Sequence, residues 1–207
     1  MARKFTRSPL ALAVLVLLYE APMHPYRMQQ LIRERGKDKV INVQRRASLY
    51  QTINQLERAE LIRVRETVRE ENRPDRTNYE LTDTGAQTAL DWLREILSTP
   101  SLEFPEFPAA VSFLPLLSVD DVLRQMELRE IALVARLAEI EADLQTPEDV
   151  LPRLFLLEEE LMSATLQAEL NWVRGLIDDL RSGALIWNTD WLRAFAPPET
   201  NLDEEDI

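Results

Sequence analysis

The sequence predicts a mainly α-helical chain in two parts, with a two-stranded β hairpin in the first part. Three observations predict this fold class. Apolar residues recur at helical spacing through most of the 207 residues, two alternating segments flank a turn at residues 69–75, and the net charge changes sign between the two parts. Because 45% of the residues are hydrophobic, the chain can bury a core, and we do not expect disorder.

The first helix is expected over residues 8–21. Ser8 suits the N-cap and Pro9 the first helical position. Basic residues before the apolar run 10–18 imitate a secretory signal, but Leu18-Tyr-Glu-Ala21 is too bulky and charged for a cleavage site. Nine residues are also too short to cross ~30 Å of hydrocarbon. We therefore expect a buried helix in a cytoplasmic protein that does not enter a membrane.

A second helix is expected over residues 25–35, with Gly36 as its C-cap. The segment 47–62 then forms a helix that buries Leu49, Ile53 and Leu56 on one face. The side chains that point away from this apolar face are Ser48, Gln51, Thr52, Gln55 and Arg58. An apolar face opposite groups that can read base edges is typical of a recognition helix.

The β hairpin is expected from residues 61–68 and 77–81, which alternate apolar and polar side chains at period two. Asn72 and Pro74-Asp75 supply turn chemistry between the strands. Thr82 is expected to cap a further helix that carries Trp92. A helix followed by strand, wing and strand predicts a winged helix-turn-helix, and we place this domain at residues 1–98.

Residues 99–207 are expected to form a helical dimerisation domain with an acidic tail. Its first part, residues 98–115, is rich in Pro and Phe and is expected to be an ordered linker whose apolar side chains are covered. Two long helices follow, the first at about 119–144 and the second from Pro147 to about Ser182, with Pro152 either kinking it or separating a first short piece. Such helices extend ~40 Å, more than one small domain needs, and usually find a partner.

The first of these long helices carries a main apolar stripe and a second one at Leu128 and Ile131. The second stripe implies that the helix is buried on more than one side.

The net charge of −12 is unevenly distributed. Residues 1–81 contain 16 basic and 10 acidic residues, a net of +6, whereas residues 82–207 contain 8 and 26, a net of −18. A phosphate backbone responds to charge within a Debye length of ~8–10 Å, so the local sign decides more than the total. We expect the first part to face double-stranded DNA and the acidic part to face away from it.

The chain resembles the PadR family of transcriptional regulators over most of its length. The motifs that carry the resemblance are Met23-His24-Pro25-Tyr26, Ser48-Leu-Tyr50 with Leu56-Glu57 and Leu61-Ile62, and Tyr79-Glu-Leu-Thr82 with Gly85. The acidic part, with its tryptophans at 172, 187 and 191, looks like the longer C-terminal helical domain of many members. The resemblance implies a homodimer that represses promoters and is often released by a small ligand.

The chain departs from the usual family residues at several positions. Glycine is usual where this chain has Pro25, Ala47 and Glu60, and proline where it has Gln51. Asp75-Arg-Thr-Asn78 replaces a basic run ahead of the last motif tyrosine. The scaffold positions are retained, whereas the wing contacts and the operator preference are expected to differ.

The candidate DNA-binding residues fall into three groups. Gln51, Thr52 and Gln55, with Ser48 beside them, are candidates for base edges, and Arg45 and Arg46 precede the helix where they can hold phosphates. Arg69, Arg73 and Arg76 are the wing candidates, although Glu70, Glu71 and Asp75 among them weaken the local field. The alternative for every group is an ordinary solvated polar surface.

A sensor for a small aromatic or apolar effector is expected among aromatic residues where the two domains meet. The candidates are Tyr19, Trp92, Phe104 and Phe107. The alternative is that these rings simply pack the long helices. His24 stands in a proline-rich turn and is interpreted as a structural or exposed histidine.

Enzymatic activity is not expected, and neither is a metal or another cofactor. The chain has no cysteine, one histidine and four glycines, and it contains no Glu-x-x-His pair, Gly-rich phosphate loop or Ser/His/Asp set. The alternative to a DNA-binding regulator is a winged-helix module that binds another protein, which the acidity and the tail Asp203-Glu-Glu-Asp206 favour. A salt titration of DNA binding discriminates between the two.

Overall fold

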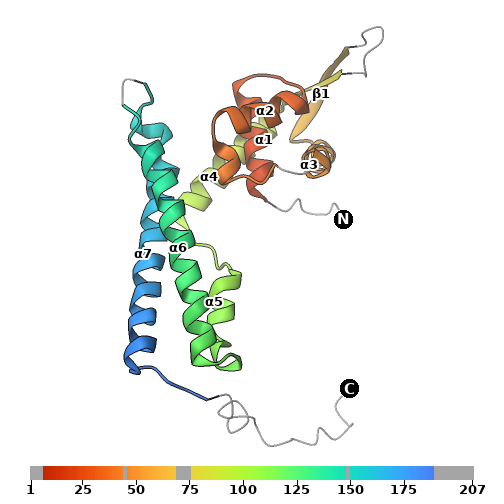
Figure 1. The fold of residues 1–207 in the computed structure, drawn as a ribbon. Helices are drawn as coiled ribbons and strands as arrows, with labels where there is room; N and C mark the ends of the chain where they lie inside the picture. Colours follow the sequence, from red (N-terminus) through yellow and green to blue (C-terminus); the bar gives the residue numbers. More distant parts are fainter. Residues whose placement is uncertain (1–6, 44–45, 69–75, 148–149, 189–207) are drawn as a thin grey trace, which may run out of the picture. The chain divides into compact units, whose positions relative to one another are not determined.

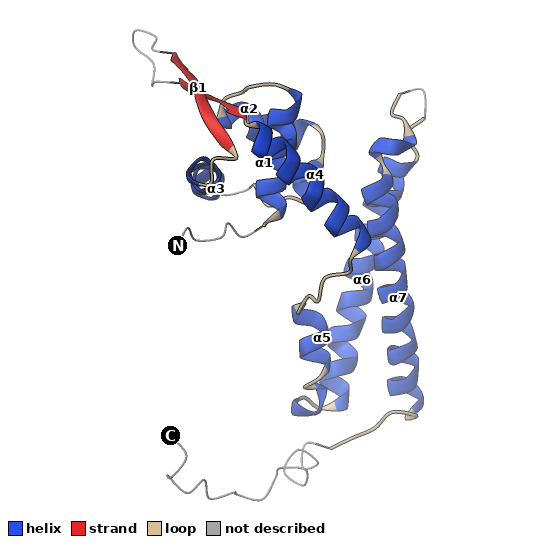
Figure 2. Ribbon diagram, turned by 180° about the vertical axis from the view of Figure 1, so that it is seen from behind, coloured by secondary structure: helices blue, strands red, loops and turns tan. Residues whose placement is uncertain are grey.

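The computed structural model describes residues 7–43, 46–68, 76–147 and 150–188, without the side chains of Arg46, Val68 and Arg76. The chain divides into two compact units, with the boundary between Glu103 and Phe104 (Figure 1). Helices dominate both units, and the strands form one two-stranded sheet in the first (Figure 2). The predicted fold class is confirmed.

The first unit contains four α-helices and the sheet. Its elements are α1 (Pro9–Glu20), α2 (Pro25–Glu34), the 3₁₀ turn η1 (Lys37–Lys39), α3 (Arg46–Arg58), β1 (Ile62–Val68), β2 (Arg76–Leu81) and α4 (Asp83–Ser98). The caps agree with those expected: the Ser8 hydroxyl accepts the Ala11 N–H at 3.1 Å, and Gly36 follows α2 with a φ of 66°.

Helix α1 lies at the centre of the core of the first unit. Its residues are apolar on almost every side, and Ala11, Val14 and Leu15 are completely buried. Helix α3 contributes Ile53 and Leu56, which are equally buried, to the same cluster. Burial of one apolar face fixes which face of α3 remains outside, because a helix cannot turn without exposing that face to water.

The sheet pairs β1 with β2 antiparallel, with Ile62 opposite Leu81 and an irregularity between Val64 and Glu66. Met23 adds a bridge to this sheet, since its N–H and carbonyl each bond the backbone of Tyr79 at 3.1 Å. The turn before α2 is therefore joined to the base of the wing by backbone hydrogen bonds.

The second unit is a helical hairpin with a short helix against it. Its elements are α5 (Glu106–Val111), η2 (Leu114–Leu116), α6 (Val119–Leu144), η3 (Arg153–Phe155) and α7 (Leu157–Ser182). Helices α6 and α7 lie side by side (Figures 1 and 2) and bury one apolar stripe each between them. Ion pairs between the two helices add to this packing, among them Glu127 with Arg181 and Glu130 with Arg174, both at 2.7 Å.

The second long helix does not begin at Pro147, as one expectation had it. The chain forms η3 first, and α7 begins at Leu157. The reason is Pro152, which has no N–H to donate and would interrupt a continuous helix.

Two further expectations about this unit are wrong within the single chain. The segment 98–115 contains α5 and η2, yet Phe104 is 87% exposed and Phe113 is 69% exposed. The second stripe of α6 is not buried either, because Leu128 and Ile131 are 61% and 67% exposed. The residues that the structure describes do not cover these side chains.

None of the helices in the described ranges is long and apolar enough to cross a membrane.

Candidate nucleic-acid interface

Helix α3 presents a continuous polar face to solvent. Its buried residues Leu49, Ile53 and Leu56 hold the opposite side against the core. The exposed side chains on the outer face recur at intervals of three and four residues: Ala47, Gln51, Asn54, Gln55 and Arg58. Amides at this spacing can form paired hydrogen bonds with base edges.

The four candidates for base contacts differ in their exposure to solvent. Gln51 and Gln55 are exposed, whereas Ser48 and Thr52 are half-buried at its edge. The Thr52 hydroxyl donates to the Ser48 carbonyl at 2.9 Å, so its proton is already used inside the helix. Gln51 and Gln55 are therefore the better placed readers of the four.

The arginine candidates fall mostly outside the described residues. Arg45, Arg69 and Arg73 lie outside them altogether. Arg46 opens α3 and Arg76 opens β2, and their side chains are outside the described part of the chain. Their roles at phosphates remain predictions.

Asn54 is not among the sequence-predicted candidates, yet it lies on the outer face of α3 between Gln51 and Arg58. The three-residue step from Gln51 would have identified it. Arg63 and Arg65 on β1 are further exposed cations that the prediction omits. Glu80 on β2 balances them, because its carboxylate accepts from the Arg63 Nε at 2.7 Å and lies 3.9 Å from the Arg65 Nε.

Two contacts set the position of α3 in the fold. On one side, the buried Gln29 of α2 donates its amide to the Val43 carbonyl at 2.9 Å, which fixes the chain just before α3. On the other side, the Thr82 hydroxyl donates to the Glu60 carbonyl at 2.8 Å and accepts the Gly85 N–H at 3.0 Å. The start of α4 is thus joined to the turn that ends α3.

Gly85 makes this junction sterically possible. A Cβ atom at this position would lie 1.9 Å from the carbonyl oxygen of Leu61. No other residue type fits so close an approach of two backbones. Glu60, in the same junction, has a φ of 57°, which is the left-handed region that favours glycine.

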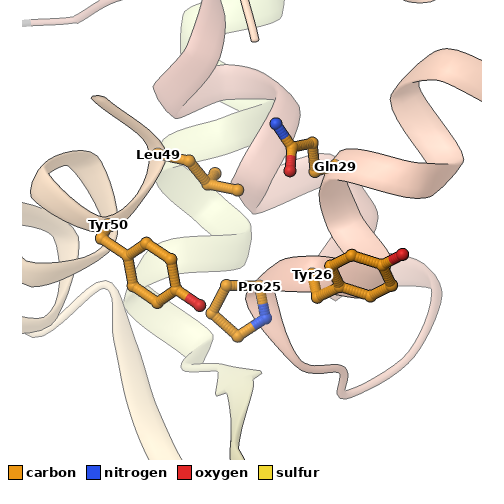
Figure 3. Close-up of a pocket in the computed structure, with 5 residues that line it drawn as sticks. All are labelled: Pro25, Tyr26, Gln29, Leu49 and Tyr50. Carbon is orange, nitrogen blue, oxygen red and sulfur yellow. The ribbon is translucent and has the colours of Figure 1, made fainter. Parts of the chain in front are cut away.

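His24 is structural, because its Nδ1 accepts the Tyr26 N–H at 3.0 Å and caps α2. Beside it a hollow opens between α2 and α3, lined by Pro25, Tyr26, Gln29, Leu49 and Tyr50 (Figure 3). Its volume of about 30 Å³ suits a single water molecule rather than an aromatic effector.

Tyr79 of β2 lies near Tyr50, one of the residues that line the hollow. Its burial, with the nearby Glu57 carboxylate and Tyr50, raises the pKa of the Tyr79 phenol above its ordinary value. The phenol is therefore neutral over the physiological pH range.

The effector candidates belong to different units. Tyr19 is exposed on α1, and Trp92 of α4 packs against the core of the first unit. Phe104 is exposed, and Phe107 of α5 packs against the core of the second unit.

Phe107 has a clear packing role. The Arg129 guanidinium lies 3.3 Å from the centre of its ring, and Trp172 meets it edge-to-face with ring centres 5.9 Å apart. Arg129 also donates to Glu169 at 2.6 Å. This cluster attaches α5 to α6 and α7. The described residues contain no group of three or more His, Cys, Asp or Glu that would hold a metal ion.

Comparisons with known proteins agree with this geometry. Residues 14–90 match the model of the PadR-like family of transcriptional regulators. The chain is similar to Bacillus subtilis PadR in complex with operator DNA, with a TM-score of 0.62 at 18% identity over 84% of this chain and 99% of that one. It is also similar to the Vibrio cholerae virulence activator AphA, with a TM-score of 0.61 at 20% identity over 84% of this chain and 99% of that one.

A structure of Bacillus subtilis PadR in complex with p-coumaric acid gives a TM-score of 0.54 at 19% identity over 80% of this chain and 98% of that one. A search of curated proteins finds no match. At these identities the structural likeness concerns the fold.

Proposed function

We propose that the chain is a transcriptional regulator of the PadR-like family, whose model matches residues 14–90, and that it binds double-stranded operator DNA as a homodimer and represses transcription there. The observation that carries the proposal is the outer face of α3, where exposed amides and Arg58 stand opposite a fully buried apolar face. A helix built in this way enters the major groove with its polar side towards the bases.

Base reading is assigned to Gln51, Asn54 and Gln55. The amide of Gln or Asn can donate from its NH2 group to adenine N7 and accept with its oxygen from the adenine N6 amino group, so adenine is the base that such groups recognise best. Ser48 and Thr52 contribute at the edge of the contact. Phosphate binding is assigned to Arg45 and Arg46, which stand at the helix N-terminus, where the backbone also favours anions.

The wing arginines Arg69, Arg73 and Arg76 are proposed to follow the phosphate backbone beyond α3. The acidic residues among them limit this contribution. Most of the sequence-independent affinity is therefore assigned to Arg45 and Arg46.

The homodimer is supported by an exposed seam on α6. Its members are spaced alternately three and four residues apart, and all are exposed: Leu128, Ile131, Ala135, Ala138 and Ala142. This is the heptad spacing of a helix that packs against another helix, and the small residues allow a close approach. Two copies joined through α6 would present two recognition helices to successive major grooves, ~34–36 Å apart.

A small aromatic or apolar effector is proposed to release the DNA, on the strength of the relative that was crystallised with p-coumaric acid. Tyr19, Trp92, Phe104 and Phe107 remain its candidate contacts. The mechanism needs no catalysis, and we propose a cytoplasmic protein without enzymatic activity.

A salt titration of DNA binding tests the central proposal. The wild-type chain should bind a labelled duplex from the region ahead of its reading frame, with affinity falling steeply as log[salt] rises. Replacing Arg45 and Arg46 with alanine should weaken binding to all duplexes and reduce that slope. Absence of binding even at low salt would overturn the proposal and favour the protein-binding module.

The substitution Gln51→Ala tests whether the Gln51 side chain recognises the base sequence of the DNA. It should cost about 1–3 kcal/mol of discrimination between cognate and random duplexes. The matched control is Gln30→Ala, because Gln30 is an exposed glutamine on α2 rather than on α3. Equal losses on cognate and random DNA would contradict the role of Gln51.

Repression is tested separately with a reporter gene behind the bound promoter. Deletion of the regulator should raise reporter output, because an occupied promoter excludes the polymerase. A fall in output would contradict repression while leaving DNA binding intact, as expected for an activator such as the one from Vibrio cholerae.

A further inference from the structure

We propose that Tyr26 and Tyr50 form a second DNA contact, in which both phenol hydroxyls donate hydrogen bonds to the phosphate backbone beside the groove that α3 reads. This inference rests on the proposed function, because it requires α3 to lie on DNA. It adds a neutral backbone contact to a surface whose other proposed backbone contacts are arginines.

The two tyrosines rim one hollow (Figure 3). Tyr26 comes from the first turn of α2, and Tyr50 comes from α3. Their rings lie on either side of Pro25, and their exposures are 59% and 45%. Both residues are large and apolar enough to be buried in a core, so their exposure on one rim points to a ligand there.

The hollow and the base-reading face both include residues of α3. Tyr50 directly precedes Gln51 on α3, and Leu49 on its other side is buried in the core. A DNA strand that borders the major groove at Gln51 would therefore pass the rim at Tyr50 and continue towards the N-terminus of α2. First helices of helix-turn-helix motifs cross the backbone in this manner.

The phenol hydroxyls are uncharged side-chain donors at this end of α2. Pro25 has no N–H, the Tyr26 N–H is bonded to His24 Nδ1, and the Arg27 N–H is bonded to the His24 carbonyl at 2.9 Å. The backbone amides of the first turn are thus already satisfied inside the protein. Phenol hydroxyls donate well to anionic oxygens, and the positive end of the helix dipole favours an anion beside them.

The size of the hollow agrees with a backbone contact. Its volume of about 30 Å³ excludes an aromatic ligand, but a phosphate oxygen or the edge of a deoxyribose needs no deeper space. Tyrosine is among the residues that contact phosphates in protein–DNA complexes, and such contacts set the register without reading sequence. The proposed pair would hold the strand while Gln51 and its neighbours read the bases.

The test is the replacement of each tyrosine by phenylalanine, which removes the hydroxyl and keeps the ring. Binding is measured by fluorescence anisotropy on a random-sequence duplex of about 20 base pairs, over a range of salt concentrations. Each variant should lose about three- to ten-fold in affinity, the worth of one net hydrogen bond. The double variant Tyr26→Phe/Tyr50→Phe should lose more than either.

The salt dependence separates this contact from an arginine contact. No cation is removed, so the slope of log affinity against log[salt] should stay at the wild-type value while the affinity falls. Gln30→Ala is the matched control, since Gln30 is an exposed uncharged residue on α2 that does not line the hollow. It should bind like the wild type.

Three outcomes would overturn the proposal. Unchanged affinity of the double variant, in a wild-type protein that binds DNA, refutes the tyrosine contact and leaves the proposed function standing. A reduced salt slope would show that a cation was disturbed instead. A thermal midpoint lowered in proportion to the lost affinity would show that the hydroxyls support the fold. If the wild type binds no duplex, the proposed function fails and this inference fails with it.

Discussion

The two units of the chain bury their apolar side chains to different extents. In the first unit, four helices and a sheet enclose Leu15 and Ile53 completely. In the second, α6 and α7 bury one stripe each, and Leu128 and Leu161 remain 61% and 69% exposed. The difference follows from geometry, because two helices can cover only the sides that face each other. The first unit completes its own core, whereas the described part of the second leaves apolar surface exposed.

The largest expected effect is on the stability of the first unit, where the backbones of Gly85 and Leu61 approach closely. Gly85→Ala should destabilise that unit by about 3 kcal/mol, because the added Cβ would collide with the Leu61 carbonyl. Urea denaturation followed by circular dichroism measures it.

The matched control lies in the second unit. Gly175 of α7 has open space around its Cβ position, so Gly175→Ala should stabilise α7 by about 0.5–1 kcal/mol through helix propensity. Destabilisation by Gly175→Ala would indicate that a second copy approaches α7 closely at this point, which would change the proposed placement of the dimer seam on α6.

A second experiment tests whether the exposed seam joins two copies. Ile131→Glu places a charge in the middle of the seam and should convert the dimer into a folded monomer at micromolar concentration, as measured by sedimentation velocity. Gln167→Glu adds the same charge to an exposed polar position of α7 and should leave the dimer intact. If the wild-type chain already sediments as a monomer, the exposed residues of α6 do not join two copies, and the proposed difference between the two units is contradicted.

A smaller effect is expected from substitutions at one residue in each unit whose backbone has the left-handed conformation. Glu60 in the first unit has a φ of 57° and Gly183 in the second a φ of 75°. Glu60→Gly should raise the free energy of unfolding by about 0.5–1 kcal/mol, because glycine adopts this conformation without steric cost. Gly183→Ala should lower it by a similar amount. Thermal denaturation of both variants measures the two changes in stability. Changes of the same sign would contradict the explanation.

The smallest effect concerns two surface ion pairs. In the first unit, the Arg35 guanidinium bonds both oxygens of Glu20 at 2.6 and 2.7 Å and lowers the pKa of that carboxyl. A lowered pKa means that the pair stabilises the fold above the unfolded pKa of about 4.3 and loses this contribution as the pH falls through the folded value. Glu20→Gln should therefore cost less than about 1 kcal/mol at pH 7 and nothing once the pH lies well below the folded pKa.

The corresponding pair in the second unit joins Arg153 to Glu160 and also lowers the pKa of Glu160. The Arg153 side chain is 71% exposed, compared with 43% for Arg35, so water screens this pair more and Glu160→Gln should have the weaker effect. Unfolding curves at several pH values compare the two variants. A larger loss at Glu160 than at Glu20 would contradict this order.

Much of this molecule follows from local sequence. Ser8, Gly36 and Thr82 mark helix ends because capping requires groups that reach only a few residues along the chain. The alternation in residues 61–68 and the spacing of Leu49, Ile53 and Leu56 likewise predict β1 and the inner face of α3. These features depend on side-chain type and period, which are properties of the sequence alone.

The tertiary structure decided what depends on distant neighbours. Thr52 turns its hydroxyl back to Ser48, and Asn54 occupies the outer face instead, because the core fixed the rotation of α3. The hollow at Tyr26 and Tyr50 exists only where α2 and α3 meet. The exposure of Leu128 and Ile131 was not predicted, since an apolar stripe reports that burial is favourable and does not say whether the same chain or another one provides it.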